Sequence, residues 1–311
     1  MTQKLAVFTN NTTFLKWTDR FDTTVYSMPK ESSFRVRPLL TKGWWYLNLP
    51  RRIRSVSKSA DVVFVDFLSE VGQKVTHHSK KPVFMRIHRT ELDFPKLFEG
   101  VNWSNVAAVV GVSEHYAGLL REMIPKEVPI VVIPPGVDDK KWPFKPSDTG
   151  KICAWALPTP RKRIYSLMLA LKDYPIYIGG YSAEDRILIE ANERFGLGHI
   201  LEPDVSFPEW QWDKEYYIHH ALDESFGVAI AEAMLSGMIP LVHRIPCVLE
   251  FTPEELTYVY DSELIDLIED MRSRSPEDRL ELKKSLREII LEGYTHERVS
   301  EKMERLFLEG P

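Results

Sequence analysis

Cysteines, amide side chains and long apolar runs are all scarce in this sequence of 311 residues. The two cysteines, Cys153 and Cys247, lie far apart without metal-type spacing, so we expect buried thiols in a reducing compartment. No apolar run approaches the ~18 residues that cross a bilayer, and the N-terminus lacks a signal-peptide layout. These absences predict a cytoplasmic protein. Three glutamines and six asparagines against 28 glutamates are typical of thermophilic sources.

Charge is divided unevenly along the chain. The formal net charge of −5 combines +7 over residues 1–150 with −12 over the remainder. A basic half joined to an acidic half indicates two domains with different partners. The negative net charge and the absence of a nucleic-acid-binding motif argue against a nucleic acid as a partner of either domain.

Near-continuous β-branched runs alternate with helical stretches through both halves of the chain. We expect strands at 4–10, 61–67, 82–88, 106–113 and 129–136, and again at 151–157, 175–180, 216–222 and 238–244. Runs of this kind suit parallel strands that are buried on both faces, and the alternation predicts doubly wound α/β domains.

A polar segment separates the two halves, and the chain ends in helices. Residues 136–151, broken by Pro143 and Pro146, read as a linker. The tail from Ser262 reads as helical: Ser275 caps one helix, Gly293 ends it, and a last helix follows.

The stretch "DESFGVAIAEAML" at 223–235 places two glutamates, Glu224 and Glu232, eight positions apart. On one continuous helix they would lie roughly 80° apart, which is not a simple solvent-facing stripe. We therefore expect Glu224 in a loop after the strand at 216–222, and Glu232 on the following helix. The amides of Phe226, Gly227 and Val228 would begin that helix and favour a phosphate. Two carboxylates beside a phosphate seat suit a nucleotide-sugar; the alternative is a buried helix with Glu232 on its rim and Glu224 as a loop acid.

The segment "ESFGVAIAEAMLSGMIPLV" resembles the E-x7-E segment of retaining glycosyltransferases of family 4, which have the GT-B fold. Further pieces resemble this family in the expected order: "KKPVFMRIHRTEL", "VVGVSEHYAGLL", "VVIPPGVD", "PTPRKRIYSLMLAL" and "YTHERVSEKMERLF". The resemblance implies two Rossmann-like α/β domains facing across a cleft. It places the acceptor-side domain at 1–145, the nucleotide-sugar-binding domain at 146–290, and at 291–311 a C-terminal helix that returns to the first domain.

The resemblance also implies roles for single residues. Glu224 would hold hydroxyls of the transferred sugar and Glu232 the ribose, while Lys162, with Arg161 beside it, would bind the donor diphosphate. His88 would contribute to catalysis, partly through its backbone; the alternative is a strand-end histidine that packs on its neighbours.

Two departures from the family pattern concern donor and acceptor binding. A common arginine of the family falls on Ala156, so Arg161 or Arg163 would take its part at the diphosphate. The first loop, "NNTTF" at 10–14, has no glycine, although Asn10 and Thr12 can donate hydrogen bonds.

No acidic residue occurs between Glu31 and Asp61. The stretch instead carries seven basic residues and three adjacent aromatic ones: Arg35, Arg37, Lys42, Arg51, Arg52, Arg54 and Lys58, with Trp44, Trp45 and Tyr46. We expect Arg51, Arg52 and Arg54 to form a patch for an anionic membrane surface, on the inner face of the cell membrane. The alternative is a solvated helix face with its tryptophans in the core.

The expected function is transfer of a glycosyl unit, of hexosyl type, from a nucleoside-diphosphate sugar to a hydroxyl, with anomeric retention. The acceptor would be a sugar, a glycolipid or a protein glycan, and neither a metal nor a cofactor is expected. The alternatives are a nucleotide-sugar epimerase of the same fold and a non-catalytic nucleotide-sugar-binding protein.

Overall fold

The computed structural model describes residues 2–9, 15–27, 38–184 and 186–311, and for residues 38–46 it describes the backbone alone. The chain forms two compact units, one of residues up to Gly136 together with His296–Pro311, the other of Val137–Thr295. Both are α/β units built on parallel sheets, as the alternating pattern predicts.

The first unit is built on a six-stranded parallel sheet with the order β2-β1-β3-β4-β5-β6. Its strands are β1 (Lys4–Thr9), β2 (Asp22–Ser27), β3 (Val62–Asp66), β4 (Val83–Ile87), β5 (Val106–Gly111) and β6 (Ile130–Val132). Its helices are α1 (Pro38–Ser59), α2 (Glu70–His78), α3 (Arg89–Leu92), α4 (Lys96–Glu99), α5 (Glu114–Met123) and α12 (His296–Glu309), with short 3-10 turns η1 (Lys16–Arg20) and η3 (Trp103–Asn105).

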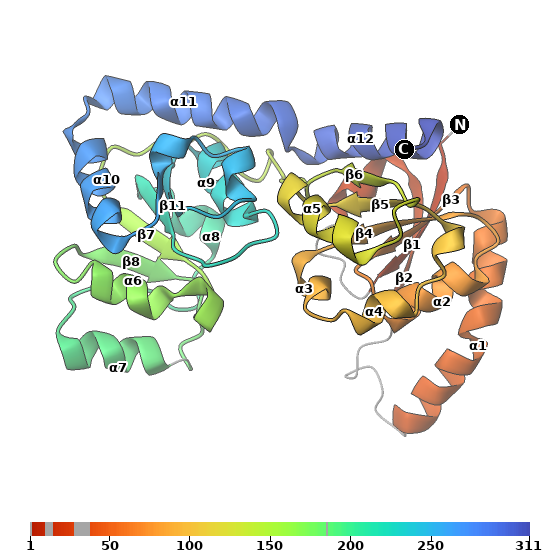
Figure 1. Cartoon of the computed structure of the whole chain (residues 1–311). Helices are drawn as coiled ribbons and strands as arrows, with labels where there is room; N and C mark the ends of the chain where they lie inside the picture. Colours follow the sequence, from red (N-terminus) through yellow and green to blue (C-terminus); the bar gives the residue numbers. More distant parts are fainter. Residues whose placement is uncertain (1, 10–14, 28–37, 185) are drawn as a thin grey trace. The chain divides into compact units, whose positions relative to one another are not determined.

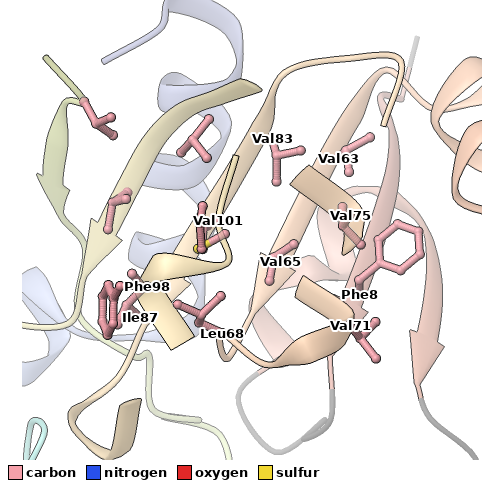
Figure 2. Packing of buried hydrophobic residues seen from close by; sticks show 14 of the residues in the cluster. Phe8, Val63, Val65, Leu68, Val71, Val75, Val83, Ile87, Phe98 and Val101 are labelled. Carbon is pink, nitrogen blue, oxygen red and sulfur yellow. The ribbon is translucent and has the colours of Figure 1, made fainter. Parts of the chain in front are cut away.

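Side chains that alternate along the central strands of this sheet fill two separate cores. In β1, Ala6 and Phe8 point into one core and Leu5 and Val7 into the other. The first core lies under α1 and α2 and is drawn in Figure 2 with Phe8, Val63 and Val75 among its members. Burial on both faces explains why these strands have no polar alternation.

The C-terminal helix α12 completes the second core of the first unit, as the resemblance implies. Val299 and Met303 pack with Trp17, and the Ser300 hydroxyl donates to the carbonyl oxygen of Trp17. On the helix surface, Arg20 lies 3.3 Å from Glu297. Figure 1 shows α12 beside the strands of this unit, although it is last in the chain.

The second unit is built on a six-stranded parallel sheet with the order β12-β11-β10-β7-β8-β9. Its strands are β7 (Ile152–Trp155), β8 (Ile176–Gly179), β9 (Ile200–Leu201), β10 (Tyr216–His219), β11 (Ile239–His243) and β12 (Thr257–Tyr258). Its helices are α6 (Ile164–Ala170), α7 (Arg186–Phe195), α8 (Phe207–Trp210), α9 (Val228–Ser236), α10 (Asp261–Ser273) and α11 (Pro276–Gly293), with 3-10 turns η4 (Pro160–Lys162), η5 (Val248–Glu250) and η6 (Glu254–Leu256).

The segment expected to be a linker packs against the second unit. Trp142 is buried, with its ring 5.2 Å from that of Phe207, and the Lys145 amide donates to the Ser236 carbonyl. The segment has almost no regular secondary structure, as its polar sequence with two prolines predicts. Trp142 nevertheless gives it an apolar anchor.

Each sheet has a point where the order of its strands reverses. In the second unit the chain runs from β7 outward to β8 and β9, then returns to place β10 on the other side of β7. In the first unit the same reversal lies between β1 and β3. Ligands of open α/β sheets bind at the carboxyl ends of strands at such points. The loops after β7 and β10 are therefore the expected ligand site of the second unit.

Candidate functional site

The loops after β7 and β10 lie side by side because their strands are neighbours in the sheet. The amide of Leu222 in the second loop donates to the carbonyl of Arg161 in the first, at 2.9 Å. A guanidinium N–H of Arg161 also donates to the carbonyl of Asp223. These bonds bring the cations of the first loop to the carboxylate of the second.

Glu224 is the centre of this cluster. Its Oε1 atom accepts from the ammonium of Lys162, lies 3.0 Å from a guanidinium nitrogen of Arg161, and lies 3.2 Å from Nε2 of His219. All three contacts fall on the same oxygen, so Oε2 takes no part in them. Its carbonyl oxygen accepts from the Cys247 thiol at 2.9 Å, which fixes the loop from the other side.

The hydrogen-bond and ion-pair partners of Glu224 keep it ionised. Burial raises the pKa of this carboxyl, but His219 and Lys162 lower it by more, so the pKa lies below the usual range. The side chain is 13% exposed, so the carboxylate is largely screened from water. The site therefore holds a negative charge that is paired with two cations.

His219 is a site residue that the sequence reasoning missed. Its Nδ1 atom lies 3.2 Å from the hydroxyl of Tyr217, and both side chains are buried. Tyr217 and His219 are two positions apart on β10 and so share a face, a polar pair inside an otherwise apolar strand. This polar pair, whose His219 lies five residues before Glu224, is the sequence signal that could have indicated His219. His220 points to the other side and bonds Tyr258 at 2.7 Å, as expected for consecutive histidines.

Gly227 is the N-cap residue of helix α9 and belongs to the expected phosphate seat. Gly227 has a φ of 97°, and a Cβ there would come within 2.9 Å of Ile230, so the position requires glycine. The amides of Ile230 and Ala231 bond back to the Gly227 carbonyl. The amides of Phe226, Gly227 and Val228 precede these bonds and have no acceptor inside the helix.

Glu232 lies on α9 and is partly buried. Burial raises the pKa of Tyr217 well above its usual value, and the nearby charges of Glu224 and Glu232 raise it further. Both carboxylates thus lie close enough to one buried phenol to affect its ionisation.

The three consecutive basic residues of the β7 loop point to different partners. Arg161 and Lys162 turn toward Glu224, whereas the guanidinium of Arg163 lies 3.9 Å from Asp261 and 3.4 Å from the Ser166 hydroxyl. A cavity of about 340 Å³ lies beside Arg163. Neither Glu224 nor Lys162 lines this cavity, so it is separate from the cluster. Ala156 is buried at the start of the same loop and presents no charge.

In the first unit, His88 sits at the end of β4 in a buried polar group. Its Nε2 atom lies 3.1 Å from Oδ1 of Asp66, and its ring stacks on Phe67 at 3.8 Å. Arg86 binds both oxygens of Asp66, at 2.7 and 2.9 Å, and is fully buried. His88 is 4% exposed, so the imidazole packs on its neighbours.

Beside His88, Glu91 is a buried carboxyl that accepts from the Leu68 amide at 3.0 Å and from the Thr90 hydroxyl at 2.8 Å. Burial raises its pKa from 4.5 to about 7, although these hydrogen bonds lower it. The folded state therefore holds a proton that the unfolded state releases above pH 4.5, and stability falls as the pH rises from there to 7.

We expect Glu91→Gln to remove this pH dependence. Between pH 5 and pH 8 the wild type should lose about 2.5 kcal/mol of stability through this one group, and the variant should not. Urea unfolding of both proteins at the two pH values measures the difference. If the free energies of unfolding of the variant and the wild type differed by the same amount at both pH values, the raised pKa of Glu91 would be contradicted.

The exposed basic patch lies on α1. Arg51, Arg52 and Arg54 are all exposed, while Ile53 between them is buried. The structure does not describe the other residues of the basic stretch: it gives only the backbone of Lys42, Trp44, Trp45 and Tyr46, and Arg35 and Arg37 are outside the described residues. Asn10 and Thr12 of the first loop are also outside them. In the ranges the structure describes, no helix is long and apolar enough to cross a membrane.

Both cysteines are free and buried, as predicted. Burial raises the pKa of the Cys153 and Cys247 thiols far above that of a reactive cysteine. Among the described residues, no group of three or more histidine, cysteine, aspartate or glutamate side chains is arranged to hold a metal ion.

The sequence matches no protein-family model and no curated protein. Several solved structures are similar over almost the whole chain. The HepE protein of Anabaena, in complex with UDP-glucose, has a TM-score of 0.76 at 14% identity and covers 99% of this chain and 100% of its own. A glycosyltransferase from Rickettsia africae ESF-5 has a TM-score of 0.76, also at 14% identity, with 99% and 98% covered. The sucrose-phosphate synthase of Thermosynechococcus elongatus has a TM-score of 0.77 at 14% identity, with the same coverage. These full-length matches show that the chain has the GT-B fold.

Proposed function

We propose that this protein is a retaining glycosyltransferase that moves a hexosyl unit from a nucleoside-diphosphate sugar to a hydroxyl acceptor. The observation that carries the proposal is the Glu224 cluster, where Lys162 and Arg161 meet a carboxylate at the switch point of the second sheet. The HepE structures with UDP and with UDP-glucose support a donor of this class.

In the proposed reaction, the bond between the sugar C1 and the diphosphate oxygen breaks and negative charge collects on the diphosphate. Lys162, Arg161 and the first amides of α9 would stabilise this charge, because fixed donors gain strength in a site with little water. Glu224 would accept from sugar hydroxyls and Glu232 from the ribose. On the same face of the sugar, the acceptor hydroxyl would attack C1 and pass its proton to the leaving phosphate.

For His88 we propose a contribution through its backbone. Its ring is occupied by Asp66 and Phe67, and burial lowers its pKa despite the carboxylate beside it. An imidazole that is 4% exposed is a poor candidate for direct contact with a substrate.

Incubation with a panel of nucleotide-sugars, starting with UDP-glucose, and simple hydroxyl acceptors tests the function. The proposal predicts acceptor-dependent release of a nucleoside diphosphate, with a product whose anomeric configuration, read by NMR, matches the donor. Conversion of the donor sugar without an acceptor would instead identify an epimerase. Nucleotide binding without any turnover would identify a binding protein.

We further propose that Arg51, Arg52 and Arg54 bind an anionic membrane surface from the cytoplasmic side, bringing a glycolipid within reach as acceptor. Each near-surface cation adds about 1 kcal/mol, so replacing all three by glutamine should weaken binding to phosphatidylserine vesicles by about 100-fold. Cosedimentation at low and high salt measures this change. The matched control replaces Lys96, Arg121 and Lys126, three exposed cations elsewhere in the first unit. Equal loss in the control, or binding insensitive to salt, would contradict the patch.

A further inference from the structure

Glu224 has two kinds of partner. Lys162 and Arg161 are cations on a short turn, with side chains 19% and 35% exposed. His219 is 3% exposed and belongs to the central strand β10. A diphosphate competes with the carboxylate for the two cations, because it carries more negative charge and binds the same donors. The buried ring has no comparable route away from Glu224.

Departure of both cations would leave Glu224 as a largely buried carboxylate without a positive partner. A buried carboxylate needs hydrogen-bond donors, since otherwise it takes up a proton or turns toward water. Either change would remove the acceptor that the sugar hydroxyls need. The His219 ring is the one of the three Oε1 partners placed to stay.

We propose that His219 is a positioning residue, whose Nε2–H holds the Glu224 carboxylate in place while a nucleoside diphosphate draws Lys162 and Arg161 away. This inference rests on the proposed function. It assigns the two carboxylate oxygens different tasks, with Oε1 anchored to the ring and Oε2 presented to the sugar.

Tyr217 fixes the ring in the form that this task requires. Burial lowers the pKa of His219 more than Glu224 raises it, so the ring is neutral and carries one N–H. With the proton on Nε2, the ring donates to Glu224, and its Nδ1 can accept from the Tyr217 hydroxyl, which also lies 3.3 Å from the Trp155 carbonyl oxygen. The other tautomer would set the Nε2 lone pair against a carboxylate. The raised pKa of Tyr217 keeps its hydroxyl protonated and able to donate.

Two substitutions of His219 separate positioning from packing. Glutamine can place an amide N–H near the position of Nε2, whereas leucine fills similar space and donates nothing. We expect His219→Leu to lower kcat with the nucleotide-sugar by about 100-fold, the effect of a misplaced catalytic group. His219→Gln should have a kcat only about tenfold below that of the wild type. Tyr217→Phe should cost about tenfold, because the ring loses the partner that selects its tautomer.

The affinity for the free nucleoside diphosphate, which has no sugar for Glu224 to hold, is the second measurement. It should stay within about threefold of the wild type in all three variants. Equal loss of diphosphate binding, or equal kcat in the leucine and glutamine variants, would overturn the positioning role. A wild type that binds no nucleoside diphosphate would overturn the proposed function itself, and this result is distinct from either.

Discussion

Glu224→Gln is expected to lower kcat for glycosyl transfer by about 100- to 1,000-fold, the range found when one preorganised polar group is removed from an active site. The same substitution should leave the affinity for the free nucleoside diphosphate equal to or tighter than that of the wild type. The reason is the ion pairing: Glu224 holds Lys162 and Arg161, and a neutral amide would release both cations to the phosphates.

Glu232→Gln is the matched comparison on the same segment. Because Glu232 is assigned to the ribose, its substitution should weaken binding of the nucleotide and change kcat less. Steady-state kinetics with the nucleotide-sugar and calorimetry with the nucleoside diphosphate separate the two effects. If Glu224→Gln lost nucleotide affinity and kcat to the same degree, the sugar-binding role of Glu224 would be wrong.

Asp66→Asn is expected to destabilise the first unit by about 3–5 kcal/mol, a large part of the stability of a domain. Asp66 is the buried partner of both guanidinium contacts of Arg86 and also bonds His88. Burial raises the pKa of Asp66, but Arg86 and His88 lower it below its usual value, so the carboxylate is charged. Removing its charge takes away the carboxylate that two nitrogens of the buried Arg86 guanidinium bind.

Chemical unfolding monitored by tryptophan fluorescence measures this loss, since Trp17 lies within 5.8 Å of the Arg86 guanidinium. Asp93→Asn is the control, because Asp93 pairs with Arg89 while 58% exposed and should cost less than about 1 kcal/mol. The double change Asp66→Leu with Arg86→Met should restore most of the stability, because it removes both charges together. A single Asp66→Asn variant as stable as the control would contradict this account.

The central strands and the two-unit fold follow from the sequence because burial on both faces leaves an unmistakable apolar run. The cap at Ser275 is confirmed for a similar reason, since a side-chain oxygen that accepts from a nearby backbone amide is a local property. The edge strand β2 is missed because it reads "DTTVYS" and is mostly exposed, so no apolar run marks it. Strands β9 and β12 have two residues each, too few to show a period.

At the site, the sequence indicates Glu224, Lys162 and Arg161 as separate candidates, but it does not indicate that they bind one another. That contact depends on β7 and β10 being neighbours in the sheet. It joins Lys162 to Glu224, which lie 62 positions apart in the sequence. The Asp66–Arg86 pair has the same origin, since β3 and β4 bring the two side chains together across the sheet. Contacts across strands of a parallel sheet leave no local pattern in the sequence.

Thermal unfolding in the presence of free nucleotides is the measurement that tests the central claim most directly. A panel of UDP, GDP, ADP and TDP, with their common sugars, should contain one base family that stabilises the wild type by about 2.7 kcal/mol at 100 times its Kd. Lys162→Ala with Arg161→Ala should abolish this stabilisation while the protein still unfolds cooperatively. If no nucleotide moves the unfolding transition of the folded wild type, the Glu224 cluster is not a donor site and the proposed function is wrong.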